Sequence, residues 1–292
     1  MTAKSAKFRF RNMSPRKQMR VAFQGELGAF SHSAALKLLG EHIKLSPRPT
    51  FKDVFEVLGR EEADFAVIPI ENTLHGSVHE NYDHLLDYHF VIAGETSIRI
   101  SHQLIGVPGV SFRQIRRVLS HPVALNQCKR FFERYPRIQS APHYDTAGSV
   151  KTVMDSNLQE TAAIASRIAA ETYGGTILKE NIEDSRENFT RFFLLTKQHT
   201  IVGRAQGAPK TSVVFSAENR SGALFRAIAC FALRDLNLTK IESRPLRGKP
   251  WEYLFYVDFI GSADDEIVRN ALTNLRECTQ SLKLLGSYYP TP

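Results

Sequence analysis

The hydrophobic and polar positions between Arg20 and residue 200 follow two repeating patterns. Short, continuous apolar runs are typical of buried strands, and apolar residues three or four positions apart are typical of helices packed on a sheet. The predicted strands are Val21–Phe23, Phe65–Ile70, Phe90–Ala93, Leu104–Val107, Val118–Leu119 and Phe192–Leu195. The predicted helices are Ala34–Leu39, Phe51–Arg60, Asn81–Leu86, Ala124–Tyr135, Ala147–Met154 and Thr161–Tyr173. Strands that alternate with helices predict an α/β domain with a mostly parallel sheet covered on both faces.

A different pattern begins after the Gly-, Ala- and Pro-rich segment 203–209. The predicted elements, alternating in the order strand, helix, strand, strand, helix, strand, are Thr211–Phe215, Gly222–Leu233, Asn237–Ser243, Glu252–Phe259, Ile267–Cys278 and Leu282–Leu285. This order is that of a ferredoxin-like α+β sandwich. We therefore predict a basic flexible tail (1–19), an α/β domain (20–200), a linker (201–209) and an α+β domain (210–290).

The positive charge of the chain is concentrated at its N-terminus. The first 20 residues hold seven basic residues and no acid, so the net charge of +8 leaves only +1 for everything after them. A segment with so little apolar surface is typical of a solvated tail, and a targeting remnant is the alternative because transit peptides are rich in Arg and Ser. We therefore expect no nucleic-acid partner.

Hydropathy and cysteine usage indicate the cellular compartment. No apolar run approaches the ~20 residues that cross a bilayer, and no apolar core of a secretory signal is present. The three cysteines, Cys128, Cys230 and Cys278, are far apart and form no CxxC pair, which suits a reducing compartment. The sequence therefore predicts a cytoplasmic protein with no membrane partner, and organellar targeting by the basic tail is the alternative.

Three segments place a tight polar turn between a strand and a helix: Gln24–Gly28, Ser120–Pro122 and Asp145–Gly148. Ser120 can cap the second helix, and Asp145 or Thr146 the third. Helix N-termini carry unpaired N–H groups, so several that converge beyond the carboxyl ends of the strands would bind an anion. Ordinary capping is the alternative for each turn taken alone.

Two further polar segments lie at the ends of predicted strands. Glu71-Asn72-Thr73 follows the strand Phe65–Ile70, and Asn188-Phe189-Thr190-Arg191 precedes the last strand of the α/β domain. Arg191 could hold a carboxylate with two parallel hydrogen bonds, and Thr190 could donate a hydrogen bond or a proton. The sequence contains no P-loop, no GxGxxG, no metal-ligand spacing and no Ser/His/Asp arrangement, so no metal or cofactor is expected.

Four motifs together resemble those of prephenate dehydratases, in the order of that family: Pro69–Thr73, Ser120–Pro122 with Gln127-Cys128, Asp145–Ala147, and Asn188–Phe192. The resemblance runs from about Arg20 to the C-terminus. It implies a two-lobed α/β catalytic domain like that of periplasmic binding proteins, with the active site between the lobes. It also implies that Thr190 is the catalytic hydroxyl and that Arg191 holds a substrate carboxylate.

The same resemblance implies the other residues of the pocket. These are Asn72 and Gln127 as further catalytic residues, and Glu71, Phe192, Ser120 and Thr146 as substrate-binding residues. One departure is Val123, where members of the family commonly have Gln. Because Gln127 is retained, we expect a shifted pocket wall rather than lost activity.

The implied reaction converts prephenate to phenylpyruvate with loss of CO2 and water. The ring becomes aromatic, so the driving force lies in the substrate, and one positioned proton donor contributes ~10²–10⁴-fold. Such a reaction requires neither a metal nor a cofactor.

The α+β unit resembles the ACT domain of phenylalanine-regulated dehydratases. The resemblance rests on Ser221–Leu224 and Ile241–Pro245, and Gly248–Glu252 and Leu285–Tyr288 also fit it. It implies L-phenylalanine as an allosteric inhibitor, and a homodimer or homotetramer in which the first two motifs face each other across a subunit interface. The implied effector residues are Gly222, Ala223, Leu224, Glu242, Ser243, Arg244 and Pro245.

Two alternatives to this function stay open. Arogenate dehydratase shares the fold and motifs and acts on the amino-acid analogue of prephenate. A non-catalytic, amino-acid-responsive binding protein could use the same two-lobed fold. The presence of both Thr190 and Arg191 argues against the second alternative.

Overall fold

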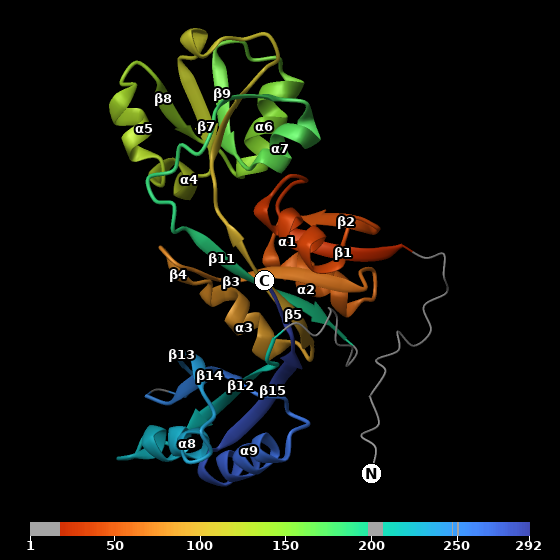
Figure 1. The fold of residues 1–292 in the computed structure, drawn as a ribbon, viewed down its shortest axis with the longest axis vertical. Helices are drawn as coiled ribbons and strands as arrows, with labels where there is room; N and C mark the ends of the chain where they lie inside the picture. Colours follow the sequence, from red (N-terminus) through yellow and green to blue (C-terminus); the bar gives the residue numbers. More distant parts are fainter. Residues whose placement is uncertain (1–17, 198–206, 247, 250) are drawn as a thin grey trace.

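The computed structural model describes residues 18–197, 207–246, 248–249 and 251–292. These residues form three sheets, and Figure 1 shows three bodies stacked along the long axis of the molecule. The second lobe of the α/β domain lies at the top, the first lobe in the middle and the C-terminal domain at the bottom. Most of the predicted tail (1–19) and of the predicted linker (201–209) falls outside the described residues.

The first lobe is built on a mixed sheet. Its strands lie in the order β16 (Pro290–Thr291), β5 (Val91–Arg99), β11 (Phe189–Thr196), β3 (Phe65–Asn72), β1 (Met19–Gln24) and β2 (Ile43–Arg48), with β4 (Gly76–Ser77) paired to β3. Helix α1 (Phe30–Leu39) packs on one face of this sheet, and α2 (Phe51–Gly59) and α3 (His79–Asp87) pack on the other. A capping box between Thr50 and Asp53 fixes the start of α2.

The second lobe has its own sheet. Its strands lie in the order β10 (Thr176–Lys179), β6 (Gln103–Gly106), β9 (Thr161–Ala165), β7 (Arg117–Ser120) and β8 (Gln139–Pro142). Its helices are η1 (Phe112–Gln114), α4 (Pro122–Asn126), α5 (Lys129–Arg134), α6 (Thr146–Asp155) and α7 (Arg167–Tyr173). The chain passes between the lobes twice, through residues 100–102 and 180–188.

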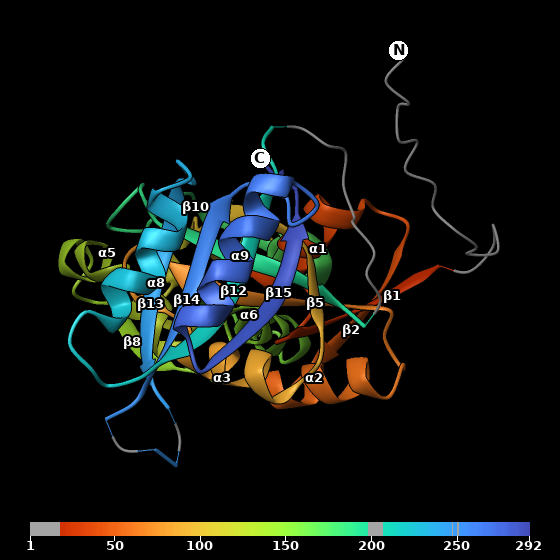
Figure 2. The ribbon, with the colours of Figure 1, turned by 90° about the horizontal axis from the view of Figure 1, so that it is seen from below.

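The C-terminal domain is a four-stranded antiparallel sheet with two helices on one face. Its strands lie in the order β13 (Leu238–Pro245), β14 (Tyr253–Ile260), β12 (Lys210–Ala217) and β15 (Ser281–Tyr288). Figure 2 shows its helices, α8 (Ala223–Ala232) and α9 (Glu266–Cys278), side by side over this sheet. The predicted two-lobed α/β domain followed by a ferredoxin-like domain is therefore confirmed.

The C-terminal domain packs tightly against the first lobe. The face of its sheet opposite the helices shares one apolar cluster with α2, α3 and the first-lobe sheet, to which Val214, Tyr256 and Tyr288 contribute. The last strand, β16, then pairs in parallel with β5 at the edge of the first-lobe sheet. Apolar burial and strand pairing therefore join the two units, and a movement of one bears directly on the other.

Two of the predicted helices are wrong. Thr161–Ala165 is the central strand β9, because its buried backbone pairs with β6 and β7, and this pairing outweighs the helix propensity of its alanines. The predicted helix Ala124–Tyr135 is broken into α4 and α5. The Asp184 carboxylate accepts hydrogen bonds from the backbone N–H groups of Lys129 and Arg130, which starts a new helix there.

The prediction of a mostly parallel sheet is wrong in part. Strands β1, β2 and β3 are parallel, as are β7, β8 and β9. However, β11 is antiparallel to both β3 and β5, and β6 is antiparallel to β9 and β10. The reason is the double crossing, because the chain returns from the second lobe and enters the first-lobe sheet in the opposite direction. Within the described ranges, no helix has the length and apolar character needed to span a membrane.

Candidate active site

The candidate active site lies where β3 and β11 run side by side. Thr190 is opposite Asn72, and Arg191 is opposite Glu71. A register shift follows, because the next residue of β11 pairs with Pro69 and leaves Ile70 unmatched. A bulge of this kind reverses the face to which the following side chains point. The bulge thereby keeps each residue at the end of β3 on the same face of the sheet as its partner in β11.

The two faces of the first-lobe sheet have different neighbours. Phe192 packs in the apolar cluster that contains α1 and the second lobe, whereas Phe193 packs in the cluster shared with α2, α3 and the C-terminal domain. Successive side chains of a strand point to opposite faces. Thr190 therefore lies on the α1 face and Arg191 on the face toward the C-terminal domain. Figure 1 shows α1 on the side of the sheet nearer the second lobe.

A hydrogen bond joins the predicted catalytic residues Thr190 and Asn72. The Nδ2 atom of Asn72 lies 2.9 Å from Oγ1 of the buried Thr190. The backbone N–H groups of Leu74 and His75 both donate to Asn72 Oδ1, each at 3.0 Å. A backbone N–H can only donate, so these two bonds fix the orientation of the amide and turn its NH2 group toward Thr190. The threonine oxygen therefore accepts, and its own proton is available to a bound molecule.

Asn188 belongs to the same cluster and is absent from the predicted catalytic set. Its Oδ1 accepts a hydrogen bond of 2.7 Å from Asn72 Nδ2, and its side chain is fully buried. Within the described part of the chain, its Nδ2 has no hydrogen-bond partner. A buried amide donor is rarely left unpaired, so Nδ2 is a candidate to bind substrate. The signal in the sequence is its position two residues before Thr190, which places both side chains on one face.

The segments that cross between the lobes carry a second polar cluster. The Glu183 carboxylate accepts from Arg99 Nη2 at 2.6 Å and from the backbone N–H of His102 at 2.8 Å. His102 Nε2 and Gln127 Oε1 lie 2.7 Å apart. Burial lowers the pKa of His102, which keeps the imidazole neutral at pH 7. The structure thus places Gln127 against the crossing segment, without a hydrogen bond to Thr190.

The predicted anion-binding helix starts are only partly as expected. The Ser120 hydroxyl donates to the Ile164 carbonyl at 2.6 Å, so it ties β7 to β9 and does not cap a helix. His121 caps α4 instead, by accepting from Val123 N. Asp145 caps α6, as predicted, with Oδ1 at 2.7 Å from Gly148 N. Thr146 is the first residue of α6, next to this carboxylate, whose pKa burial raises.

The turn before α1 lies at the junction of the two lobes. The Ser166 hydroxyl of the second lobe donates to the Gly28 carbonyl at 2.6 Å. A Cβ on Gly28 would lie 2.6 Å from Ala169 Cα, and the φ of Gly28 is +89°. Only glycine therefore allows this turn to come so close to α7 of the second lobe. Tyr144 also donates to Glu26 Oε1 at 3.1 Å. The Gln24–Gly28 turn therefore touches the second lobe directly.

Arg191 and Glu71 do not lie in the Thr190 cluster. Arg191 Nη1 is 2.7 Å from Asp258 Oδ2 and 3.3 Å from Glu95 Oε2, and Nη2 is 3.4 Å from Glu71 Oε2. Burial lowers the pKa of Arg191, but the attraction of Asp258 and Glu95 outweighs it and holds the pKa above its usual value. Protein carboxylates pair with the guanidinium on the face opposite Thr190, and its buried Nε and Nη2 make no hydrogen bond within the described residues, so the arrangement directs Arg191 away from the Thr190 cluster.

The predicted effector residues occupy two faces of the C-terminal domain. Gly222 precedes α8 in the left-handed conformation, with Ala223 buried behind it and Leu224 partly exposed. Along β13, Ser243 and Pro245 are exposed, whereas Glu242 and Arg244 face the first lobe. Glu242 Oε2 accepts from Ser77 Oγ at 2.7 Å, and Arg244 Nη2 is 3.1 Å from Asp83 Oδ2. The second predicted effector motif is thus divided between the two sides of its strand.

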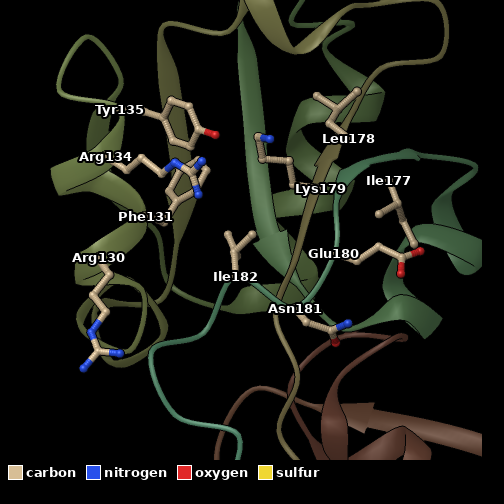
Figure 3. A pocket seen from close by; sticks show the side chains of 10 residues that line it. All are labelled: Arg130, Phe131, Arg134, Tyr135, Ile177, Leu178, Lys179, Glu180, Asn181 and Ile182. Atoms are coloured by element: carbon tan, nitrogen blue, oxygen red, sulfur yellow. The ribbon is translucent and has the colours of Figure 1, made fainter.

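A hollow of about 580 Å³ lies elsewhere on the second lobe (Figure 3). Its lining residues are Arg130, Phe131, Arg134, Tyr135 and residues 177–182. The side chains of α5 and of Tyr135 form one wall, and those of β10 and the residues that follow it form the other. The hollow shares no residue with the Thr190 cluster, so we give it no part in the candidate active site. Among the residues that the structure describes, no three His, Cys, Asp or Glu side chains are grouped to hold a metal ion.

Comparison with known families agrees with this geometry. The model of the prephenate dehydratase family matches residues 21–200, and that of the ACT domain matches residues 211–277. The chain belongs to the prephenate dehydratase family. Both polar clusters and both strands of the candidate active site lie inside the region that matches the dehydratase.

Relatives of this family resemble nearly the whole chain. Arogenate dehydratase/prephenate dehydratase 2 of Arabidopsis thaliana, named as chloroplastic, is 45% identical over 280 residues, which cover 93% of this chain and 73% of that protein. The structure of Arthrobacter aurescens prephenate dehydratase in complex with L-Phe is 31% identical, with a TM-score of 0.83, and covers 93% of this chain and 90% of that one. A structure described as a novel type of quorum quenching acylase is 30% identical, with a TM-score of 0.85, and covers 94% and 98%.

Proposed function

We propose that this member of the family converts prephenate to phenylpyruvate, CO2 and water, and that L-phenylalanine inhibits it through the ACT domain. The observation that carries the proposal is the hydrogen bond from Asn72 to Thr190, which leaves a buried hydroxyl proton free to serve a substrate. The identity to a plant enzyme named for both dehydratase activities supports it. A similar fold alone would not, because one similar structure is an acylase.

The proposed chemistry needs one proton and two breaking bonds. The bond between the ring and its carboxylate breaks, CO2 leaves, and the electron pair enters the ring. The bond between the ring and its hydroxyl then breaks, and the leaving hydroxide takes a proton to become water. Thr190 supplies this hydrogen bond and proton, because Asn72 occupies its oxygen as a donor and directs the O–H elsewhere. Solvent restores the proton to Thr190 after release.

The substrate carboxylates need donors on the Thr190 face. Asn188 Nδ2 is buried there without a partner among the described residues. Gln127 follows helix α4 of the second lobe. Gln127, Phe192, Ser120 and Thr146 stay predicted substrate contacts. Glu71 and Arg191 lie on the other face, so a different role is argued for them below.

The test of the reaction is an assay of the purified protein with prephenate and, separately, with arogenate. We expect phenylpyruvate to form from prephenate, with a higher kcat/KM than the formation of phenylalanine from arogenate. As a third assay, the protein is incubated with an amide that acylases hydrolyse, and we expect no hydrolysis. A protein that turned over arogenate alone would be an arogenate dehydratase, and turnover of the amide alone would overturn the proposal.

The orientation of Asn72 gives a more specific prediction. Asn72→Asp keeps an oxygen for the N–H groups of Leu74 and His75 but replaces the donor that faces Thr190 with an acceptor. The threonine proton then turns toward the aspartate, and we expect kcat for prephenate to fall ~10²–10³-fold, the usual effect of losing one aimed donor. The measurement is steady-state kinetics, with circular dichroism to show that the fold is retained. A kcat within a factor of two of wild type would contradict the proposed hydrogen-bond direction.

The effector and the assembly belong to the same proposal. A Cβ on Gly222 would meet only the flexible side chain of Arg226, at 3.5 Å, and the exposed side of β13 carries Ile241 and Ser243 at an edge of the sheet that the described residues form. An exposed strand edge with apolar side chains favours association with a second copy. L-phenylalanine would bind between the α8 start of one subunit and β13 of another, in a dimer or a dimer of dimers. Arthrobacter prephenate dehydratase, solved with L-Phe, supports this effector.

The domain bounds and the location in the cell are also proposals. We propose a catalytic domain at 20–200, a linker at 201–209 and a regulatory domain at 210–290, and the matched family regions at 21–200 and 211–277 support these bounds. The sequence favours the cytosol, and the relative named as chloroplastic supports an organelle as the alternative.

A further inference from the structure

A mostly buried network of charges joins the catalytic strand β11 to the ACT sheet, and its most exposed member is Glu71, with a side chain that is 37% exposed. We call it the interdomain ion-pair network. Its members are Glu71, Glu95 and Arg191 of the first lobe, and Lys210, Lys240 and Asp258 of the ACT domain. Three cations and three carboxylates therefore meet where the two units touch.

Arg191 is the centre of the network. Its Nη1 contacts both Asp258 and Glu95, whose side chains are each only 7% exposed. Glu95 also pairs with Lys210 and accepts from Tyr288 Oη at 3.2 Å. Removing one partner from such a cluster leaves an uncompensated buried charge, so the network strongly prefers one arrangement.

A chain of ion pairs, which we call the arm of the network, leads from Arg191 to β13, the strand of the predicted effector motif. Glu71 lies opposite Arg191 in the sheet and pairs with Lys240 Nζ at 3.0 Å. Lys240 is 8% exposed and also lies 3.5 Å from Glu242 Oε2. Glu242 in turn accepts from Ser77 of β4 at 2.7 Å. The arm therefore runs without a gap from β13 to β11.

Each end of the arm adjoins a functional group. Glu71 and Arg191 are the chain neighbours of Asn72 and Thr190, in the two strands whose pairing aligns the catalytic hydrogen bond. At the other end, β13 presents Lys240 and Glu242 to the first lobe and Ile241 and Ser243 to the effector side. A ligand that shifts β13 must therefore shift the charges held on its other face.

We propose that Arg191 is a positioning residue for Thr190, and that the contacts Lys240–Glu71–Arg191 transmit effector binding from β13 to the catalytic pair. The inference rests on the proposed dehydratase function and its inhibition by phenylalanine. Arg191 does not touch the substrate. It holds β11 against β3 through Glu71 and against the ACT sheet through Asp258, so the ACT domain sets the geometry of the Asn72–Thr190 hydrogen bond.

The chain offers a matched pair of lysines to test the route. Lys240→Met breaks the arm. Lys283→Met removes another half-buried lysine between the same two units, whose Nζ donates to the carbonyls of Leu85 and Tyr88 and does not reach the network. Each full-length variant is titrated with L-phenylalanine by calorimetry and assayed with prephenate over the same concentrations.

The expected result separates binding from coupling. Both variants bind phenylalanine with the wild-type Kd, and the inhibition of each is measured relative to its own turnover without phenylalanine. Coupling between effector and substrate is typically about 5–150-fold, and Lys240→Met loses it whereas Lys283→Met keeps it. Full inhibition of Lys240→Met, or equal loss in both variants, would overturn the route. Wild-type protein that did not act on prephenate or did not bind phenylalanine would instead overturn the proposed function.

The positioning role is tested by the split between KM and kcat. Arg191→Met is expected to lower kcat with little change in KM, because the guanidinium holds Thr190 and not the substrate. Arg191→Lys keeps the charge and should recover part of kcat. Asp258→Asn, which removes the ACT partner without changing its size, should lower kcat in the same direction and serves if Arg191→Met does not fold. A raised KM with unchanged kcat would restore the substrate-clamp role and refute the positioning role.

Discussion

Thr190→Ala is expected to lower kcat for prephenate by ~10²–10⁴-fold, the usual contribution of a positioned proton donor. The change removes the hydroxyl that Asn72 orients, and no other hydroxyl belongs to this cluster of described residues. The fold should persist, because Asn72 Nδ2 keeps Asn188 Oδ1 and the Phe189 carbonyl as acceptors. The measurement is steady-state turnover at saturating prephenate, with the phenylalanine Kd as a check on the ACT domain.

Thr190→Ser is the matched control. It keeps the hydroxyl and loses one methyl group, so it should retain most of the turnover that alanine loses. If the alanine and serine variants were equally slow, the methyl group and its packing would matter more than the proton. If the alanine variant were nearly as fast as wild type, Thr190 would have no part in the chemistry.

The sequence identifies the motifs correctly but not the faces from which their side chains project. Thr190 and Arg191 are adjacent in one strand, so alternation alone predicts that they point in opposite directions. The family resemblance predicts that both residues contact the substrate, which conflicts with this alternation. In the structure the two side chains do lie on opposite faces. For β3 the rule fails, because the bulge at Ile70 reverses the alternation and brings Asn72 beside Thr190. No local pattern predicts that bulge, since it depends on pairing with a strand more than 100 residues away.

The regular elements of the C-terminal domain were more predictable than those of the second lobe. Each strand and helix of the ACT domain buries one face in a small core, so local periodicity is sufficient even though β12 pairs with the distant strands β14 and β15. In the second lobe, Thr161–Ala165 is a central strand only because β6 and β7 lie on either side of it. The interdomain network is equally non-local. Glu95, Lys210 and Asp258 carry no motif, and only the packing of the ACT sheet on the first lobe brings them to Arg191.

Gly222→Trp is expected to abolish inhibition by L-phenylalanine and leave a working, unregulated dehydratase. A coupling of about 5–150-fold between effector and substrate would be lost. Gly222 has a φ of +74°, and the nearest atom to an added Cβ is Arg226 Nη1 at 3.5 Å, the far end of a flexible side chain, so a larger side chain does not clash with the backbone there. The strain of the left-handed backbone costs roughly 1–2 kcal/mol, which a folded domain tolerates.

The variant Gly207→Trp is a control that distinguishes the effect of backbone strain from that of blocking the effector site. Gly207 also has a positive φ, of +90°, and open space at its Cβ, but it lies before the ACT sheet and outside the predicted effector motif. This variant should bind phenylalanine and be inhibited as wild type is. Because coupling is reciprocal in binding, phenylalanine should weaken the binding of a substrate analogue. The factor should be the same in wild type and in Gly207→Trp, and Gly222→Trp should show no such effect. Wild-type affinity for phenylalanine in Gly222→Trp would place the effector elsewhere. Binding without inhibition would mean that the tryptophan interrupts the path from the effector to β11 rather than the site itself.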